Sequence, residues 1–118
     1  MPNKTFRISP EPLGDWEVSD MIPTECFTTE DQTELNQIFY ATADKTILAG
    51  IWECAPCKLE EVCTVDEKMT IISGALTLTN SDGVKEKFIA GDVLLTSKGS
   101  RFTWEITERL RKFYMISS

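Results

Sequence analysis

Short runs in which apolar and polar residues alternate fill the chain from residue 36 onward, and turn residues separate them. This pattern is typical of β-strands joined by short connections. The runs are NQIFYAT, TILAGIWEC, LEEVCTV, MTIISG, ALTLTN, VKEKFIA, DVLLTS, RFTWEI and RKFYMIS. Since no sustained helical period competes with them, these runs predict an all-β sandwich or barrel of about eight or nine strands.

The segments between and before these runs complete the prediction. Asn80-Ser-Asp-Gly83 separates two alternating runs, which indicates a hairpin whose glycine adopts positive φ. Residues 1–35 contain four of the five prolines and show no regular period. We therefore predict an irregular N-terminal arm over residues 1–35 that belongs to the same domain as the β-rich residues 36–118.

Composition sets the class of protein. A chain of 118 residues with 42% hydrophobic and 26% charged residues is long enough to bury one core. No apolar run approaches the roughly 18 residues of a membrane span, and the N-terminus lacks the apolar segment of a signal peptide. We expect a cytoplasmic protein without a membrane partner.

The net charge and the absence of histidine exclude further classes of function. The net charge is -7 and no basic stripe is present, so nucleic acid is not an expected partner. The chain has no histidine. This excludes a serine-histidine-aspartate triad, a histidine-paired thiolate and a three-histidine metal centre.

Three of the four cysteines lie in WECAPCKLEEVC, which includes the pair Cys54-Ala-Pro-Cys57. A redox dithiol needs its first cysteine at a helix N-terminus, but the residues that follow are typical of a strand. A zinc clip needs four soft ligands, and only Cys63 is near in sequence. We predict the end of one strand, a proline turn and the start of the next, with four reduced and mostly buried cysteines.

Two glycine-bounded segments carry a family resemblance. They are Asp66-Glu-Lys-Met-Thr-Ile-Ile-Ser-Gly74 and Gly91-Asp-Val-Leu-Leu-Thr-Ser-Lys-Gly99, the second followed by Arg101-Phe-Thr-Trp104. With Ala49-Gly-Ile-Trp-Glu-Cys54 and the ending Arg111-Lys-Phe-Tyr114, the chain resembles a small single-domain cupin of the branch related to ureidoglycine aminohydrolase and the ethanolamine-utilisation cupin. The resemblance covers about residues 45–116 and implies a double-stranded antiparallel β-helix, the cupin jelly-roll barrel, with a small site at its mouth.

The resemblance also places the metal positions of that family on this chain. In metal-binding cupins the first motif supplies two histidines and a glutamate, and the second motif supplies a third histidine. The glutamate falls on Glu67 and the last histidine on Phe102. The histidine pair falls on Glu60 and Val62 or, one residue shorter, on Glu61 and Cys63.

No histidine stands at any of these positions, so the resemblance implies that the usual metal centre is lost and that no cofactor is required. One alternative stays open. In the shorter register Glu61, Cys63 and Glu67 would offer two carboxylates and a thiolate to a zinc or iron ion.

Two function hypotheses follow. The first is a binding module that holds a small organic ligand inside the barrel, and its predicted ligand-binding residues are Trp52, Arg101, Phe102, Trp104 and Tyr114. The second is a lyase, isomerase or hydrolase acting on a small carboxylate or amide. In that case Glu67 is the catalytic acid or base, and Arg101 or Tyr114 orients the substrate.

The N-terminal arm bears on assembly. Its apolar residues Phe6, Ile8 and Trp16 suit covering a neighbouring subunit, which predicts a homodimer. The alternative is that the arm packs on its own barrel.

Overall fold

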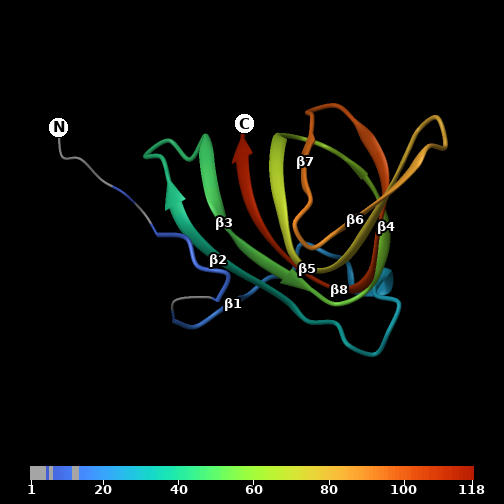
Figure 1. Cartoon of the computed structure of the whole chain (residues 1–118), viewed down its shortest axis with the longest axis horizontal. Coiled ribbons are helices and arrows are strands. Elements are labelled where there is room, and N and C mark those ends of the chain that lie inside the picture. The colour runs from blue at the N-terminus through green and yellow to red at the C-terminus, as the bar shows by residue number, and fades with distance from the viewer. Residues whose placement is uncertain (1–4, 6, 12–13) are drawn as a thin grey trace.

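A computed structural model describes residues 5, 7–11 and 14–118, which consist mainly of antiparallel strands (Figure 1). The strands are β1 (Glu17–Val18), β2 (Glu34–Ala41), β3 (Ile47–Cys54), β4 (Cys57–Val62), β5 (Asp66–Asn80), β6 (Lys85–Ile89), β7 (Val93–Thr96) and β8 (Arg101–Ser117). Among the described residues the one helical segment is a short 3₁₀ turn, η1 (Thr24–Cys26), and no helix there is long and apolar enough to cross a membrane. The predicted all-β class is confirmed.

The strands form a single sheet in the order β1-β2-β3-β8-β5-β6, with β4 paired to β8 and β7 paired to β5 off this path. Strand β8 is central because it pairs with β5 on one side and with β4 and then β3 on the other. The sheet curls strongly around one face (Figure 1). Its strand pairing does not close on itself, so the closed barrel of the prediction is not confirmed.

Two strands are longer than the sequence pattern predicts. MTIISG and ALTLTN are parts of one strand, β5, and RFTWEI and RKFYMIS are parts of another, β8. The pattern breaks because the β5–β8 register shifts between Ile71 and Leu76. At the centre of this irregular stretch Gly74 has a φ of 88°, and a Cβ there would collide with the carbonyl oxygen of Arg109. A glycine inside a strand commonly marks such a bulge and close backbone approach.

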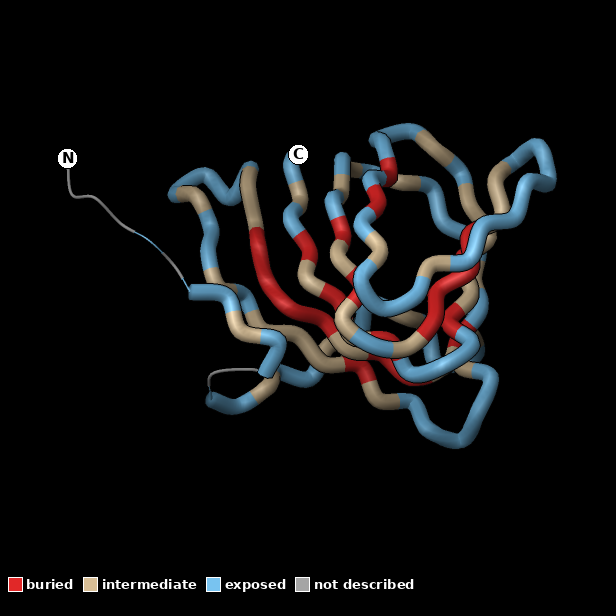
Figure 2. The backbone as a smooth tube through the Cα atoms, in the orientation of Figure 1, coloured by how far each residue is buried: buried red, intermediate tan, exposed pale blue. Residues whose placement is uncertain are grey.

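The predicted hairpin and turn are present. The Asn80 amide donates to the Val84 carbonyl at 2.9 Å, and Gly83 has a φ of 82°. Strand β3 ends at Cys54 and β4 begins at Cys57, so the Cys-x-x-Cys pair spans a tight turn. Buried positions gather on β3, β5 and β8, whereas the hairpin ends are exposed (Figure 2).

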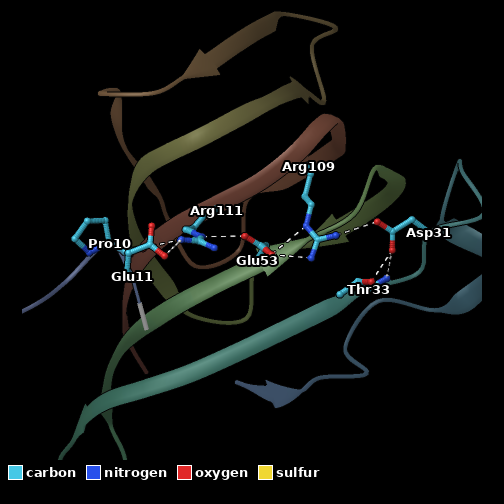
Figure 3. A network of polar contacts seen from close by, with 7 residues as sticks. All are labelled: Pro10, Glu11, Asp31, Thr33, Glu53, Arg109 and Arg111. Carbon is cyan, nitrogen blue, oxygen red and sulfur yellow. Dashed lines mark hydrogen bonds and ion pairs between the residues drawn. The ribbon is translucent and has the colours of Figure 1, made fainter. Parts of the chain in front are cut away.

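A row of ion pairs crosses the outer face of β3 and β8 (Figure 3). Glu53 accepts hydrogen bonds from Arg109 at 2.7 and 3.0 Å and from Arg111 at 2.9 Å. Arg109 continues the row to Asp31 at 3.0 Å, and Arg111 continues it to Glu11 at 3.1 Å. One carboxylate therefore links two strands of the sheet to the segments that precede it in the chain.

The N-terminal arm contacts the sheet of its own chain. Arg111 donates to the Pro10 carbonyl at 2.9 Å, and its guanidinium carbon lies 5.5 Å from the centroid of the Trp16 ring. Phe6 lies outside the described residues, and Ile8 is exposed. The described part of the arm thus packs on the sheet of its own chain, as the alternative to covering a neighbouring subunit expected. The contact between Arg111 and the ring of Trp16 helps to hold it there.

Candidate functional site

The concave face of the sheet encloses a cavity of about 390 Å³. This volume lies in the range of small-molecule sites. Of the predicted catalytic and ligand-binding residues, five line the cavity: Trp52, Glu67, Phe102, Trp104 and Tyr114. They come from β3, β5 and β8, so the pairing of these strands brings together residues that are far apart in the sequence.

Arg101 does not line this cavity. It is exposed and lines a second, outer hollow with Val62 and Thr103, and this hollow shares Glu61 and Phe102 with the cavity. Arg101 and Phe102 are consecutive residues of β8, and consecutive side chains of a strand point to opposite faces. The structure therefore does not bring Arg101 to the ligand that it was predicted to orient.

Lys112 is the cation of the cavity, and the sequence interpretation missed it. The residue is only 5% exposed, and its Nζ donates to Glu67 Oε2 at 2.6 Å and lies 3.2 Å from Met69 Sδ. A lysine is rarely buried to this degree unless it is paired. Glu67, predicted to be a catalytic acid or base, is therefore engaged in a buried ion pair.

Two indole rings surround the same ammonium group. Lys112 Nζ lies 4.9 Å from the ring centroid of Trp52 and 4.9 Å from that of Trp104. The two rings contact each other edge to face, with centroids 6.5 Å apart. A desolvated cation beside aromatic faces is stabilised by their quadrupoles. The two indole rings therefore stabilise the same ammonium group that pairs with Glu67.

The two indole N–H groups have different surroundings. Trp52 Nε1 donates at 3.0 Å to Glu34, a carboxylate that is 2% exposed. Glu34 also accepts from the Ser19 hydroxyl at 2.7 Å and the Ile22 amide at 2.8 Å. By contrast, the buried Nε1 of Trp104 has no hydrogen-bond partner among the described residues.

Tyr114 adds a fixed polar contact. Its hydroxyl donates to Asn36 Oδ1 at 2.6 Å. Burial raises the pKa of Tyr114, the Asn36 hydrogen bond lowers it, and the Glu67 carboxylate raises it further. Across the sheet, a Cβ on Gly50 would lie 2.7 Å from the Tyr114 hydroxyl, so a glycine is needed to leave room for the phenol.

The segment after the Cys-x-x-Cys turn contributes Glu61 and Cys63 to the cavity, whereas Glu60 and Val62 line the outer hollow only. Desolvation raises the pKa of the Glu61 carboxyl although its residue is exposed, and the nearby Lys112 ammonium lowers it. Burial likewise raises the pKa of the Cys63 thiol. These two side chains bring polar chemistry to the cavity mouth.

The alternative metal site consists of Glu61, Cys63 and Glu67. All three line the cavity, but within residues 5, 7–11 and 14–118 no three His, Cys, Asp or Glu side chains form a group that could hold a metal ion. Glu67 is instead paired with the Lys112 ammonium. The three-ligand site stays a prediction that the geometry does not favour.

Cys54 and Cys57 lie in the core, away from the cavity. Both are 0% exposed and neither forms a disulfide. The contact with Cys57 and burial raise the pKa of the Cys54 thiol, and the same contact lowers that of Cys57. The pair spans a turn between strands instead of beginning a helix, so it lacks the helix N-terminus that activates a redox thiolate.

A sequence signal for Lys112 exists in the last strand. Leu110, Lys112 and Tyr114 alternate with more exposed neighbours and are all buried. Period-2 alternation places them on one face, but a lysine beside Arg111 is readily interpreted as part of a short basic cluster on the surface.

Comparisons with known proteins agree with this fold. A sequence model described as the EutQ-like cupin domain matches residues 41–114. No curated protein sequence matches the chain.

Solved structures with similar folds include three at 20% sequence identity. A protein of unknown function from Pseudomonas syringae pv. tomato has a TM-score of 0.78 over 89% of this chain, which spans only 45% of the length of that protein. A putative ethanolamine utilisation protein Q from Salmonella typhimurium has a TM-score of 0.63 over 75% of this chain and 72% of its own. The EutQ protein of Clostridium difficile has a TM-score of 0.66 over 86% of this chain and 79% of its own.

Proposed function

This chain belongs to the family of EutQ-like cupin domains, and on that premise we propose that it is a ligand-binding cupin whose cavity holds a small organic molecule. The observation that carries the proposal is the cavity of about 390 Å³ with a buried Lys112–Glu67 ion pair between two indole rings. Pockets of this kind combine an apolar wall with a few fixed polar groups. We further propose that the protein acts in the cytoplasm as a homodimer.

The proposal includes the loss of the histidine-held metal ion. The chain has no histidine, and Phe102 lines the cavity at the position where the cupin resemblance places a ligand. The ammonium of Lys112 stands 2.6 Å from Glu67 Oε2, which is the carboxylate that the resemblance assigns to the metal. A fixed positive charge supplied by the chain itself fits a cavity that works without a metal ion.

A second candidate is a small-molecule lyase, isomerase or hydrolase, and the Lys112–Glu67 pair is the observation that favours it. A carboxylate and an amine in hydrogen-bond contact can exchange a proton with each other and with a bound substrate. In this case Glu67 is the acid or base, and Tyr114 orients the substrate in place of Arg101. If turnover of any substrate is found, an unaltered rate in Glu67→Gln would remove this candidate.

Blocking the cavity tests the binding proposal. Leu48 lines the cavity, so Leu48→Trp should fill part of it, whereas Val93 is exposed on β7 and outside the cavity, so Val93→Trp serves as the matched control. Fragments that raise the melting temperature of the wild-type protein and of Val93→Trp should fail to stabilise Leu48→Trp. Equal stabilisation of Leu48→Trp, or no stabilisation of the wild-type protein by a neutral aromatic fragment panel, would overturn the proposal.

A further inference from the structure

Two residues of the N-terminal arm belong to the wall of the cavity. Met21 and Ile22 lie in the irregular stretch between β1 and η1, and both line the cavity together with residues of the strands. Ile22 also packs against the buried apolar cluster of the sheet, whereas Met21 is 72% exposed. A molecule that fills the cavity would therefore contact the arm as well as the concave face of the sheet.

Glu34, the first residue of β2, holds this stretch of the arm in place. Its Oε2 accepts from the Ser19 hydroxyl at 2.7 Å, its Oε1 accepts from the Ile22 amide at 2.8 Å, and its backbone carbonyl accepts from the Ser19 amide at 2.9 Å. Glu34 is 2% exposed and forms no ion pair within the described part of the chain. A buried carboxylate without a counter-charge depends on its hydrogen-bond donors, and the arm supplies two of them.

A third donor to the same carboxylate joins the arm to the aromatic wall. Trp52 Nε1 donates at 3.0 Å to Glu34 Oε2, the oxygen atom that also accepts from Ser19. The Trp52 ring in turn lies 4.9 Å from Lys112 Nζ, and its centroid lies 6.5 Å from that of Trp104. One carboxylate thus links the arm to the indole ring that contacts the buried ion pair of the cavity.

The elements on either side of this stretch hold it only weakly. Strand β1, which precedes it, has two residues, and both are exposed. The 3₁₀ turn η1, which follows it, contains no buried residue. Segments with few buried contacts open locally at a low free energy, while the rest of the protein stays folded. Residues 19–22 are therefore the part of the cavity wall that is most able to detach, and the bonds to Glu34 oppose this opening.

We infer that Glu34 is a positioning residue that couples the docking of residues 19–22 to the occupancy of the cavity. A bound molecule contacts Met21 and Ile22 only while the arm is docked, so it binds the docked state more tightly than the undocked state. Such coupling is reciprocal, because docking of the arm and binding of the molecule favour each other by the same factor. The inference rests on the proposed function, since it requires a molecule in the cavity.

Amide hydrogen exchange at Ile22 measures the docked state, because this N–H is bonded to Glu34. Benzyl alcohol serves as the probe, since it is a neutral aromatic molecule small enough for a cavity of about 390 Å³. At a concentration that saturates its effect on the melting temperature, it should slow exchange of the Ile22 amide about threefold or more, because it shields two apolar side chains of the arm. The Gly83 amide, bonded to the Asn80 carbonyl in the hairpin outside the cavity, should exchange at an unchanged rate.

Ser19→Ala tests the role of Glu34 without any ligand, because it removes one of the donors that the arm supplies. It should speed exchange of the Ile22 amide about fivefold, which is the effect of one lost hydrogen bond. It should also shift the indole N–H signal of Trp52 in ¹H–¹⁵N spectra, because the two donors share one oxygen atom. The matched control, Thr24→Val, removes an exposed hydroxyl from the same arm and should change neither readout.

Three results would overturn the coupling, and they separate it from the binding function. If benzyl alcohol raises the melting temperature but leaves Ile22 exchange unchanged, the arm is not coupled to the cavity, and the binding function stands. If Ser19→Ala and Thr24→Val have equal effects, Glu34 does not hold the arm in place, and the binding function again stands. If benzyl alcohol does not raise the melting temperature at all, the binding function and the coupling both fall.

Discussion

Lys112 and Glu67 depend on each other because each would be a poorly solvated charge alone. Their side chains are 7% and 19% exposed, and the two groups are 2.6 Å apart. Removing one member of such a pair is costly because the other charge loses both its partner and its water, whereas replacing both is far better tolerated. The pair therefore places the buried charges of the cavity at one position on its wall.

The first prediction tests this dependence. Lys112→Met should lower the free energy of unfolding by about 3 kcal/mol, because it leaves the Glu67 carboxylate without a counter-charge. Lys112→Met/Glu67→Gln should regain at least about half of that loss, since a neutral amide replaces the stranded charge. Urea denaturation at neutral pH measures both, and equal stability of the single and double variants would contradict the account.

Tyr114 leads to a prediction about alkaline pH. Burial raises the pKa of its phenol above the unfolded value, so the folded state holds this proton more firmly than the unfolded state does. The contribution is present below the unfolded pKa of about 10 and is lost as the pH rises through the folded pKa. Urea midpoints measured from neutral pH to about pH 11 should fall less steeply for Tyr114→Phe than for the wild-type protein. Parallel curves would show that another group causes the loss.

Gly74 shows how one position allows a strand as long as β5 to curl with the sheet. Its φ of 88° is unfavourable for other residues, and a Cβ would meet the carbonyl oxygen of Arg109 on the paired strand. Gly83 has a similar φ of 82°, but a Cβ there would meet nothing within 4 Å. The two glycines separate the cost of backbone conformation from the cost of a collision.

Alanine substitutions at Gly74 and Gly83 test this difference. Gly83→Ala should destabilise the protein by about 1 kcal/mol through its positive φ alone. Gly74→Ala should cost at least about 3 kcal/mol, because β5 and β8 must also separate. Chemical denaturation of the two variants gives the difference, and similar losses at both sites would refute the role given to the close approach.

The outer ion-pair row connects the N-terminal arm to β8. Arg109 and Arg111 both bond Glu53. Arg111 also contacts the first half of the arm, through Pro10, Glu11 and the ring of Trp16, whereas Arg109 reaches only its end, at Asp31. Ion pairs at the surface contribute little to global stability, and Glu11, which pairs with Arg111 from the arm, has a side chain that is 79% exposed. Their effect here is therefore expected to be local, on the docking of the arm.

Limited proteolysis can detect this local effect. Chymotrypsin should cleave after Trp16 about threefold or more faster in Arg111→Gln than in the wild-type protein, because the covering guanidinium is gone. Arg109→Gln removes the other ion pair to Glu53 and should keep the wild-type rate. The same acceleration in both variants would mean that Glu53, and not the Arg111 contact with the arm, governs access.

Features that depend on residues close together in the sequence were predicted correctly. Alternation gave most strands, Asn80–Gly83 gave a hairpin, and the Cys-x-x-Cys pair was correctly interpreted as a turn. The continuity of β5 and β8 was missed because the bulge at Gly74 interrupts the period-2 pattern that identifies a strand.

The aromatic residues that line the candidate site were predictable from the sequence, but its buried lysine was not. Trp52, Trp104 and Tyr114 line the cavity because large aromatic residues on β-rich runs are usually buried. Lys112 was missed and Arg101 was placed wrongly, because the side of a strand that a charged residue occupies depends on its register within the whole sheet. That register follows from long-range pairing, which a single sequence does not reveal.

Across the whole molecule, one open sheet forms both the cavity and an exposed apolar edge. Strand β1 has only two residues and ends the sheet, pairing with β2. Val18 on this strand is 86% exposed, and Met21 just after it is 72% exposed and lines the cavity. An apolar sheet edge beside the cavity is a surface that a second copy of the chain could cover.

A homodimer is therefore expected to use this edge. Light scattering coupled to size-exclusion chromatography should give twice the mass of the 13.3 kDa chain at micromolar concentration. Val18→Lys should weaken the dimer by about tenfold or more, because it places a charge on the edge strand. Val84→Lys is the matched control, since Val84 is 55% exposed at the hairpin between β5 and β6, far from β1 in the sheet order, and it should leave the dimer intact. A monomeric wild-type protein would rule out the dimer, and equal weakening by both variants would place the interface elsewhere.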